Sequence, residues 1–311
     1  MVTELSNRTT IVSHDAGGAE VLSSYVRQNN LDCLYVLEGP ALKIFERKLG
    51  PIKNISIEDA INQSISIICS TSLQSDIEFS AIKLARDMGK HSIAFLDHWV
   101  NYHKRFVRSG LTVLPDEIWV GDMMALALAK KVFPVTPVTL IDNPYLQDVK
   151  QELLAYEKHR PLRLDSIAIL YVCEPISEHA MLHHGNPRFW GYVEEEALRY
   201  FFSNISVLGR SIERILIRPH PSEPIDKYNW MQQEFKLPIQ LGGARPLLEE
   251  IADSDLVVGC ESMAMVVALL ADKKVISCIP PGGRPCVLPH SKITSLQNIL
   301  QNKRLIYENN E

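Results

Sequence analysis

The sequence has no excess of positive charge, and this argues against nucleic acid as a partner. Its 311 residues include 32 Lys and Arg against 37 Asp and Glu, for a formal net charge of -5. Charges of both signs are interspersed, and no basic arm is present. No global positive field would therefore draw the chain to a polyanion, although a local basic pocket for one phosphate is compatible with this composition.

Paired cysteines and long apolar runs are also missing. None of the 6 cysteines forms a CxxC pair, and most lie in or beside apolar runs, where a free thiol acts as a small buried hydrophobe. The longest apolar stretches fall short of the roughly 20 residues that cross a bilayer. With no recognisable signal peptide, we expect reduced thiols and a cytoplasmic protein. Peripheral contact with the inner face of a membrane is compatible with the sequence.

Short apolar runs alternate with helical patterns along the chain, and this alternation occurs once in the first half and again in the second. Hydrophobic residues make up 46% and charged residues 22%, as in globular proteins, and the length suits two domains. Strands that are apolar on both faces and separated by helices predict a parallel sheet covered on both sides. The expected strands are 10–13, 33–37, 65–69, 92–96 and 117–120, then 166–172, 214–217, 239–241, 256–258 and 275–278.

These two rounds predict an α/β protein with two Rossmann-like αβα domains. We expect an N-terminal domain over 1–145, a linker helix over 146–165 and a C-terminal domain over 166–311. Ligands of open parallel sheets bind beyond the carboxyl ends of the strands. Two such edges facing each other would form a cleft, which is a favoured place for a ligand site.

The strongest candidate site lies in two segments of the second domain that each follow a strand. In 218–221 (RPHP), the prolines stiffen a turn that carries a guanidinium and an imidazole. In 259–262 (GCES), a strand gives way to a helix, whose N-terminal N–H groups suit a phosphate. Glu261 is placed to accept hydrogen bonds from ribose hydroxyls. In the alternative, Ser262 only caps its helix and His220 only packs a turn.

These segments resemble motifs of the GT-B glycosyltransferase superfamily, whose two Rossmann-like domains face each other across a cleft. The 218–221 segment is similar to the His-Pro motif of bacterial sialyltransferases, and to the Lys/Arg-x-His-Pro of capsule-synthesis, Kdo-type and glycerophosphate-polymer transferases. The run 254–262 (SDLVVGCES) resembles their later segment, where a strand ends in serines or Glu-Ser. The resemblance implies that His220 and Ser262 contact the donor phosphate, and that Glu261, in place of a second serine, binds ribose.

The remaining donor-site candidates also follow strands of the second domain: Glu174, Gly259, Gly282, Gly283 and Arg284. The paired glycines could admit a nucleotide and the arginine could reach its phosphate, with a simple turn as the alternative. The stretch 183–190, which contains two histidines and a tryptophan, is expected to lie in a surface loop.

Two segments of the first domain are expected to serve the acceptor. In 14–20 (HDAGGAE), Gly17 and Gly18 allow close approach of a ligand. Asp15 and His14 are expected to point into the cleft, unless Asp15 only caps the following helix.

The second of these segments is 96–105 (LDHWVNYHKR), which combines an Asp with two histidines, two aromatic residues and two cations. Its aromatic faces would stack on an acceptor sugar, and the expected acceptor residues are His98, Trp99, Tyr102 and His103. By resemblance to sialyltransferases of this fold, an acidic residue of the first domain acts as base. We prefer Asp97 to Asp15, with the reverse order left open.

The expected chemistry needs a base for the acceptor hydroxyl and positive charge for the leaving phosphate. We expect no Asp-x-Asp metal motif, so Arg218, His220 and the helix end would neutralise the phosphate without a metal ion or other cofactor. A zinc site from the histidines at 14, 98 and 103 is disfavoured, because no cysteine or further histidine lies at tight spacing.

The sequence therefore predicts a metal-independent glycosyltransferase that moves a sugar from a nucleotide sugar to a surface glycan or lipid-linked acceptor. The resemblance favours a CMP-nonulosonate or Kdo-type donor, with UDP-sugars next. A nucleotide-sugar epimerase or hydrolase of the same fold is one alternative, and a non-catalytic nucleotide-sugar-binding protein is another.

Overall fold

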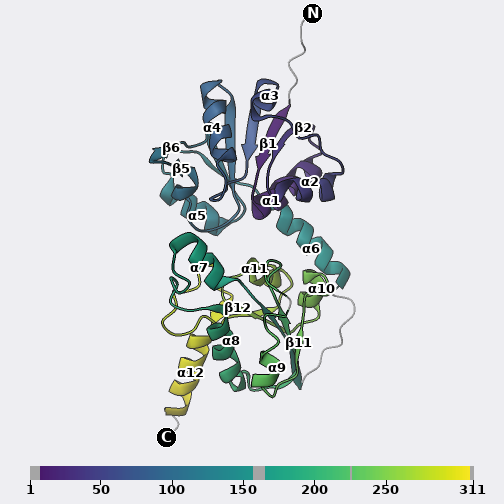
Figure 1. Ribbon diagram of the computed structural model, residues 1–311, viewed down its shortest axis with the longest axis vertical. Helices are drawn as coiled ribbons and strands as arrows, with labels where there is room; N and C mark the ends of the chain where they lie inside the picture. Colours follow the sequence, from purple (N-terminus) through teal and green to yellow (C-terminus); the bar gives the residue numbers. More distant parts are fainter. Residues whose placement is uncertain (1–7, 157–164, 225, 309–311) are drawn as a thin grey trace, which may run out of the picture. The chain divides into compact units, whose positions relative to one another are not determined.

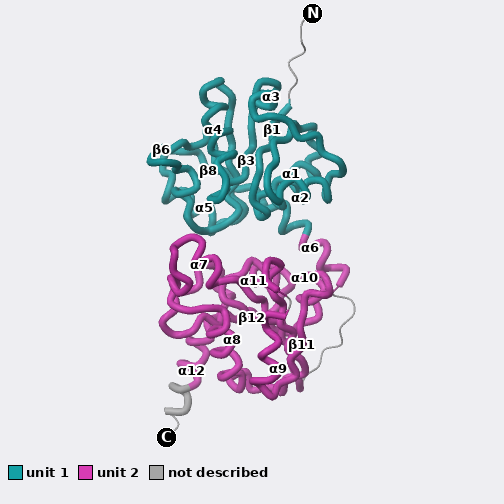
Figure 2. Tube along the Cα trace, in the orientation of Figure 1, with its two compact units in different colours: residues 1–148 teal, residues 149–311 magenta. Residues whose placement is uncertain are grey.

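The computed structural model describes residues 8–156, 165–224 and 226–308. The chain divides into two compact units, residues 1–148 and 149–311 (Figure 2). Their boundary falls inside helix α6 (Pro144–Tyr156), whereas the rest of the expected linker, 157–164, lies outside the described residues. No helix in the described part of the chain has both the length and the apolar character of a membrane span.

Unit 1 is built on a parallel six-stranded sheet (Figure 1). Its strands are β1 (Thr9–Ser13), β2 (Cys33–Leu37), β3 (Ser66–Cys69), β4 (His91–Leu96), β7 (Glu117–Val120) and β8 (Val138–Leu140). Their spatial order is β2-β1-β3-β4-β7-β8. A separate antiparallel pair follows the 3-10 turn η1 (His103–Phe106), made of β5 (Val107–Arg108) and β6 (Leu111–Thr112).

Helices cover both faces of this sheet. They are α1 (Ala16–Asn29), α2 (Ala41–Leu49), α3 (Ile57–Asn62), α4 (Ile77–Asp87) and α5 (Met123–Val132). On one face, Ile11, Ile68 and Phe95 pack against α1 and α2 in a single buried cluster. Because side chains alternate along a strand, their neighbours face α3 and α4 on the other side. The strands are therefore apolar on both faces, as expected from the sequence.

Unit 2 repeats this architecture. Its parallel strands are β9 (Ser166–Val172), β10 (Ser211–Arg218), β11 (Ile239–Leu241), β12 (Leu256–Gly259), β13 (Lys274–Ser277) and β14 (Ile293–Ser295), in the spatial order β11-β10-β9-β12-β13-β14. The helices are α7 (Ile176–His184), α8 (Glu194–Ser203), α9 (Met231–Glu234), α10 (Leu247–Ala252), α11 (Met263–Leu270) and α12 (Leu296–Glu308), with a 3-10 turn η3 (Ile205–Leu208). Phe201 of α8 is fully buried against the strand residues Tyr171 and Ile217.

The structure confirms the predicted α/β class and the two parallel Rossmann-like sheets. All ten expected strands are present, and β8 and β14 complete the two sheets at one edge each. The prediction of a loop at 183–190 is wrong for the first two residues, because His183 and His184 are the last residues of helix α7. That helix is short and its apolar pattern is weak, which is why the sequence did not reveal it.

In each sheet, the chain order reverses between two neighbouring strands, and such a switch point is where open α/β sheets bind ligands. The switch point of unit 1 lies between β1 and β3, and that of unit 2 between β9 and β12. The strand order of unit 2, counted within the unit, is the order found in dinucleotide-binding folds. The loops after these four strands are therefore the places to look for a site.

Candidate functional site

In unit 2, the loops after β9 and β12 meet at the switch point. Tyr171 of β9 pairs with Val258 of β12, so the two strands end level with one another. The Glu174 carboxylate accepts a hydrogen bond of 2.9 Å from the backbone N–H of Glu261. Two acidic residues from distant parts of the chain thus share the turn that leads into α11.

Burial changes the protonation of Glu174. Desolvation, together with the nearby negative charge of Glu261, raises the pKa of the Glu174 carboxyl to about 8. At neutral pH this carboxyl therefore holds a proton. In that form it adds no repulsion to a phosphate bound at the same edge.

Glu261 is fixed by the segment that follows β13. One carboxylate oxygen pairs with Arg284, and the other accepts a hydrogen bond of 3.3 Å from the backbone N–H of Val287. The Arg284 guanidinium lies over the Trp190 ring, 4.6 Å from its centroid. Its Nε is buried and has no hydrogen-bond partner among the described residues. Arg284 is therefore held at this edge with one donor unused.

Ser262 is the N-cap of α11, where its Oγ accepts the backbone N–H of Ala264 at 3.2 Å. This is the capping role that the sequence left as an alternative. A hydroxyl group both accepts and donates, so its proton remains available to a ligand. Gly259 allows α11 to approach the sheet, since a Cβ there would lie 2.8 Å from Val172 Cγ2 and 3.1 Å from Met265 Sδ.

The glycines that follow β13 pack against another segment of the protein. A Cβ on Gly283 would lie 2.6 Å from Ile279 Cγ2 and 2.7 Å from Tyr192 Cδ1. A Cβ on Gly191 would lie 2.3 Å from the carbonyl oxygen of Gly282. Close packing of two chain segments accounts for the small residues here, and their contact with a nucleotide stays a prediction.

Arg218 and His220 line a pocket of about 330 Å³ between the ends of β10 and β11. Nη1 of Arg218 donates to the Glu250 carboxylate at 2.6 Å and to the Arg245 carbonyl oxygen at 2.9 Å. Glu250 is buried and also accepts the backbone N–H of Gly243, another lining residue, at 2.8 Å. This ion pair joins the two strand ends and fixes one side of the pocket.

The imidazole of His220 is arranged as a hydrogen-bond donor. Its Nδ1 accepts the backbone N–H of Ser222 at 3.2 Å, and the Glu223 carboxylate accepts the backbone N–H of His220 at 2.9 Å. Desolvation, with the like charge of His179, lowers the pKa of His220, so the ring is neutral at neutral pH. Nδ1 also lies 2.7 Å from the Ser222 hydroxyl oxygen. In the tautomer whose Nδ1 accepts the backbone N–H, the ring proton lies on Nε2, which can donate to a phosphate oxygen.

His220 and Ser262 lie at the same edge of one sheet. β10 and β12 flank β9 on its two sides, so their ends are about 10 Å apart at a strand spacing of about 4.8 Å. Glu174, at the end of β9, lies between them. The structure therefore brings the expected donor residues of unit 2 to a single edge.

In unit 1, the loops after β1 and β3 meet in the same way. Asp15 Oδ1 accepts a hydrogen bond of 2.8 Å from the Ser72 hydroxyl and lies 2.7 Å from His14 Nδ1. Asp15 is at the N-cap position of α1, but its side chain makes no capping hydrogen bond. The carboxylate is thus engaged by His14 and Ser72, and the simple capping alternative is wrong.

A buried glutamate that the sequence analysis missed supports this edge. Glu78 of α4 is 3% exposed, and its Oε1 accepts the backbone N–H of His14 at 3.0 Å and the Ser70 hydroxyl at 2.9 Å. Desolvation raises its pKa. Its Oε2 is buried without a hydrogen-bond partner in the described residues. In the sequence, Glu78 looks like any acidic residue in the first turn of a helix, so no local signal marks it.

Asp97 follows β4 and lies against the first turn of α1. A Cβ on Gly17 would be 2.4 Å from Asp97 Oδ2, so glycine leaves room for the carboxylate. Arg105 Nη1 lies 3.5 Å from Asp97 Oδ1 and donates to the Thr71 carbonyl oxygen at 2.8 Å. Asp97 thus reaches the turn that carries Asp15, and both candidate bases lie at one edge.

The aromatic residues of 96–105 are packed inside unit 1. Trp99 and Tyr102 are 8% and 4% exposed, and Trp99 Nε1 donates to Asp122 Oδ2 at 2.8 Å. His98 is partly buried, whereas His103 is exposed at the start of η1. Their packing supports the loop that carries Asp97, and stacking on an acceptor sugar stays a prediction.

The described residues contain no group of three or more His, Cys, Asp or Glu that could hold a metal ion. The histidines at 14, 98 and 103 therefore do not gather into a site there. The expectation of no Asp-x-Asp motif is wrong, because one occurs at 253–255, although it lies before β12 rather than after it. Its Asp255 accepts the backbone N–H of Ala168 at 2.8 Å, at the end of the sheet away from Glu174.

No protein-family model and no curated protein matches this sequence. Solved structures do match the fold. The glycotransferase of kitacinnamycin is 10% identical with a TM-score of 0.54, and the match covers 95% of this chain and 84% of that one. A putative UDP-N-acetylglucosamine 2-epimerase from Listeria monocytogenes is 12% identical with a TM-score of 0.54, over 87% and 78% of the two chains. At this identity the likeness shows a common GT-B-like two-domain α/β fold.

Proposed function

We propose that this protein is a glycosyltransferase that moves a sugar from a nucleotide sugar to a glycan acceptor, without a metal ion. One observation carries the proposal: the switch points of both sheets hold polar groups, and the two sets suit different halves of a transfer reaction. Unit 2 offers neutral hydrogen-bond donors, a helix N-terminus and an arginine. Unit 1 offers two carboxylates and an imidazole.

The donor phosphate would bind at the edge of unit 2. Nε2 of His220, the Ser262 hydroxyl and the N-terminus of α11 would all offer N–H or O–H groups to this anion. Arg284 adds a positive charge that the Trp190 ring and Glu261 hold in place. As the bond to the sugar breaks, negative charge grows on the phosphate, and fixed donors at that position lower the barrier.

The nucleotide is inferred from motif resemblance. The 218–221 segment favours a CMP-linked nonulosonate or Kdo-type sugar, with UDP-sugars as the next choice. Glu261 would accept the ribose hydroxyls through the carboxylate that Arg284 orients. We expect surface polysaccharide, lipopolysaccharide or capsule assembly to be the setting.

The acceptor hydroxyl must lose a proton as it attacks, and a carboxylate or imidazole within hydrogen-bond reach can take it. We assign this role to Asp97, whose Oδ2 is placed against the first turn of α1. The rival is the pair of His14 and Asp15, in which the carboxylate orients the imidazole through Nδ1. In either case, the residues of both units must reach the same substrate during turnover.

A nucleotide-sugar epimerase or hydrolase is the second candidate, because a putative epimerase shares the fold at the same TM-score as the glycotransferase. Such an enzyme would use the unit 2 edge in the same way but would need no glycan. A non-catalytic nucleotide-sugar-binding protein would also bind at this edge, without turnover.

Incubation with a panel of CMP- and UDP-sugars, with and without a glycan acceptor, separates these functions. A transferase releases nucleotide quickly only when the glycan is present. Fast turnover without an acceptor would instead support an epimerase or hydrolase. Tight binding of CMP, CDP or UDP with no turnover under either condition would support a binding protein, and calorimetry with these three nucleotides identifies the base.

A further inference from the structure

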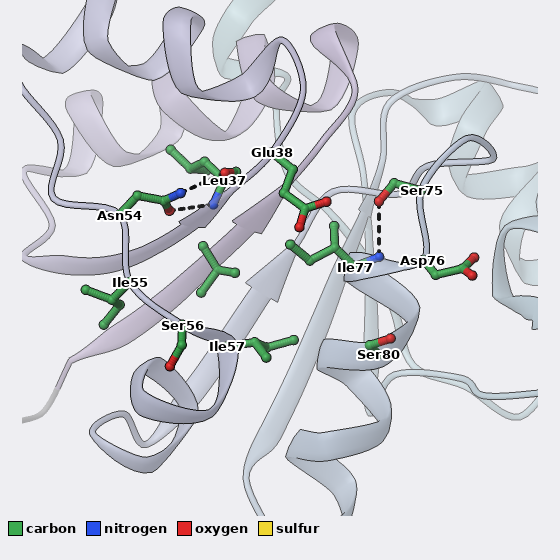
Figure 3. Close-up of a pocket in the computed structure, with 11 residues that line it drawn as sticks. Leu37, Glu38, Asn54, Ile55, Ser56, Ile57, Ser75, Asp76, Ile77 and Ser80 are labelled. Atoms are coloured by element: carbon green, nitrogen blue, oxygen red, sulfur yellow. Dashed lines mark hydrogen bonds between the residues drawn. The ribbon is translucent and has the colours of Figure 1, made fainter.

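A pocket of about 430 Å³ opens at the edge of unit 1, and none of its lining residues has been considered above (Figure 3). Its walls come from the end of β2 with Glu38, the loop 54–57 that leads into α3, and the start of α4 with Ile77 and Ser80. The volume falls within the range of roughly 300–1,000 Å³ that is usual for small-molecule pockets.

The walls of this pocket are fixed before any ligand arrives. The Asn54 side-chain amide accepts the backbone N–H of Leu37 and donates to its carbonyl oxygen, both at 2.8 Å, as Figure 3 shows. Ser56 caps α3 by accepting the backbone N–H of Asp59 at 3.1 Å. On the far wall, the Ser75 hydroxyl accepts the backbone N–H of Ile77 at 3.2 Å. A preorganised site of this kind loses little entropy on binding.

The negative charge of the pocket indicates which class of ligand it would bind. Two carboxylates line it, and Asp76 is paired with Arg108. Glu38 forms no ion pair or side-chain hydrogen bond with another described residue. The Glu38 side chain is exposed, and its negative charge disfavours a phosphate or carboxylate ligand and favours groups that donate hydrogen bonds.

The rest of the lining combines aliphatic and hydroxyl groups. Val36, Ile55, Ile57 and Ile77 supply the apolar surface, and Ser56 and Ser80 supply hydroxyls. In Figure 3, the Glu38 carboxylate and the Ile77 side chain point toward one another. A carboxylate beside an aliphatic surface matches a pyranose ring, whose C–H face is apolar and whose edge carries hydroxyl donors.

Contacts connect this pocket to the candidate catalytic edge. Ser75 lines the pocket and donates its backbone N–H to Ser72 Oγ at 3.0 Å, and the Ser72 hydroxyl donates to Asp15. On the other side, Gly39 follows Glu38, and a Cβ there would lie 2.6 Å from His14 Nε2. A ring bound in the pocket is therefore next to His14 and Asp15, the pair that rivals Asp97 for the role of base.

We propose that this pocket binds a pyranose ring of the acceptor, with Glu38 accepting hydrogen bonds from two neighbouring ring hydroxyls. The inference rests on the proposed glycosyl transfer and names the chemistry of its acceptor: a neutral sugar with free vicinal hydroxyls, bound by an aliphatic and carboxylate pocket.

The test is an amide-resolved NMR titration of the whole protein with methyl β-D-galactopyranoside and methyl β-D-glucopyranoside. We expect saturable shifts of the amides of Ser56, Ser75 and Ile77 with at least one pyranoside. Glu38→Gln should weaken this binding about tenfold, because a charge-assisted hydrogen bond is lost. Glu46→Gln, which removes an exposed carboxylate on α2, is the matched control and should leave the affinity unchanged.

The titration needs no nucleotide, so its outcome is separate from that of the proposed transferase activity. Absence of saturable shifts with both pyranosides would overturn the pocket assignment, as would equal affinity in the Glu38→Gln protein. Ethanolamine and inorganic phosphate are titrated in parallel. Stronger shifts of the same amides with either probe would show an amine or anion site instead.

Discussion

The carboxylate of Glu174 accepts the backbone N–H of Glu261 at 2.9 Å, across the switch point of unit 2. The two residues lie 87 positions apart in the chain. An acidic side chain therefore occupies the turn in which an incoming phosphate is expected. Because the pKa of Glu174 is raised to about 8, this contact is made by a neutral carboxyl at neutral pH and by an anion in alkaline solution.

The raised pKa makes folding stability depend on pH. An unfolded Glu174 releases its proton near 4.5, whereas the folded protein keeps it until about 8. Between these values the folded state binds more protons than the unfolded state, so this group lowers the free energy of unfolding as the pH rises through that window. The glutamine in Glu174→Gln stays neutral at every pH, so this variant should lose less of its free energy of unfolding as the pH rises. Urea denaturation at about pH 5, 7 and 9 measures the difference.

Glu178→Gln is the matched control, since Glu178 is exposed on α7. The stability gap between Glu174→Gln and the unmodified protein should widen from acid to alkaline pH, while the control shows no widening. A constant gap across the three conditions would mean that Glu174 is ionised throughout.

His220→Ala should weaken nucleotide binding about tenfold or more, because it removes the Nε2–H that we expect to meet a charged phosphate oxygen. Calorimetry with CMP, CDP and UDP measures the loss. His91→Ala, which changes an exposed histidine of unit 1, should bind as the unmodified protein does. Unchanged affinity in His220→Ala would remove this residue from the donor site.

Asp97→Asn should leave nucleotide affinity intact and lower turnover by roughly 10²–10⁴-fold, the usual contribution of a general base. Asp15→Asn, measured in parallel, tests the rival assignment. If Asp15→Asn has the larger effect on turnover while Asp97→Asn is nearly fully active, the base is the pair of His14 and Asp15.

Treatment with EDTA should leave most of the activity in place, because donors of the protein are proposed to stabilise the leaving phosphate. Activity is compared before and after dialysis against the chelator, with added Mg²⁺ as the rescue condition. Complete loss that Mg²⁺ restores would contradict the metal-free proposal.

Two adjacent glycines of α1 should respond differently to alanine. At Gly18 the new Cβ would lie 2.3 Å from Ser70 Cβ, on a strand end that cannot easily move, so Gly18→Ala should destabilise the protein by about 1–3 kcal/mol. At Gly17 it would meet only the Asp97 carboxylate at 2.4 Å, so Gly17→Ala should keep the stability but displace Asp97 and lower turnover. Urea denaturation and turnover of both variants test this contrast, and equal stability losses would refute it.

Much of the fold could be predicted because parallel sheets leave a clear trace in sequence. Strands such as 166–172 are buried on both faces and therefore appear as continuous apolar runs. Polar residues directly after such runs fall at the carboxyl edge, which is why His14, Asp97, His220 and Glu261 all lie there. The edge strand β8 is partly exposed, lacks that apolar run and escaped notice.

The partners of these residues could not be predicted, because they come from helices and distant loops. Nothing local indicates that Glu250 binds Arg218, or that Ser72 binds Asp15. Burial also depends on three-dimensional packing, so Trp99 and Tyr102 looked like accessible aromatic residues although they lie in the interior. The sequence pattern therefore predicts which residues follow the strands at the carboxyl edge of each sheet, but it does not predict which of their side chains are accessible to a ligand.

Glu78 illustrates what such hidden partners do. A single oxygen of this helix side chain anchors His14 at the end of β1 and Ser70 at the end of β3. A substitution that removes this oxygen would break both hydrogen bonds and make the ends of β1 and β3 less well ordered, although Glu78 itself contacts no substrate. A genetic screen for inactive variants should therefore recover Glu78 as readily as the residues that carry out the chemistry, and its loss would imitate theirs.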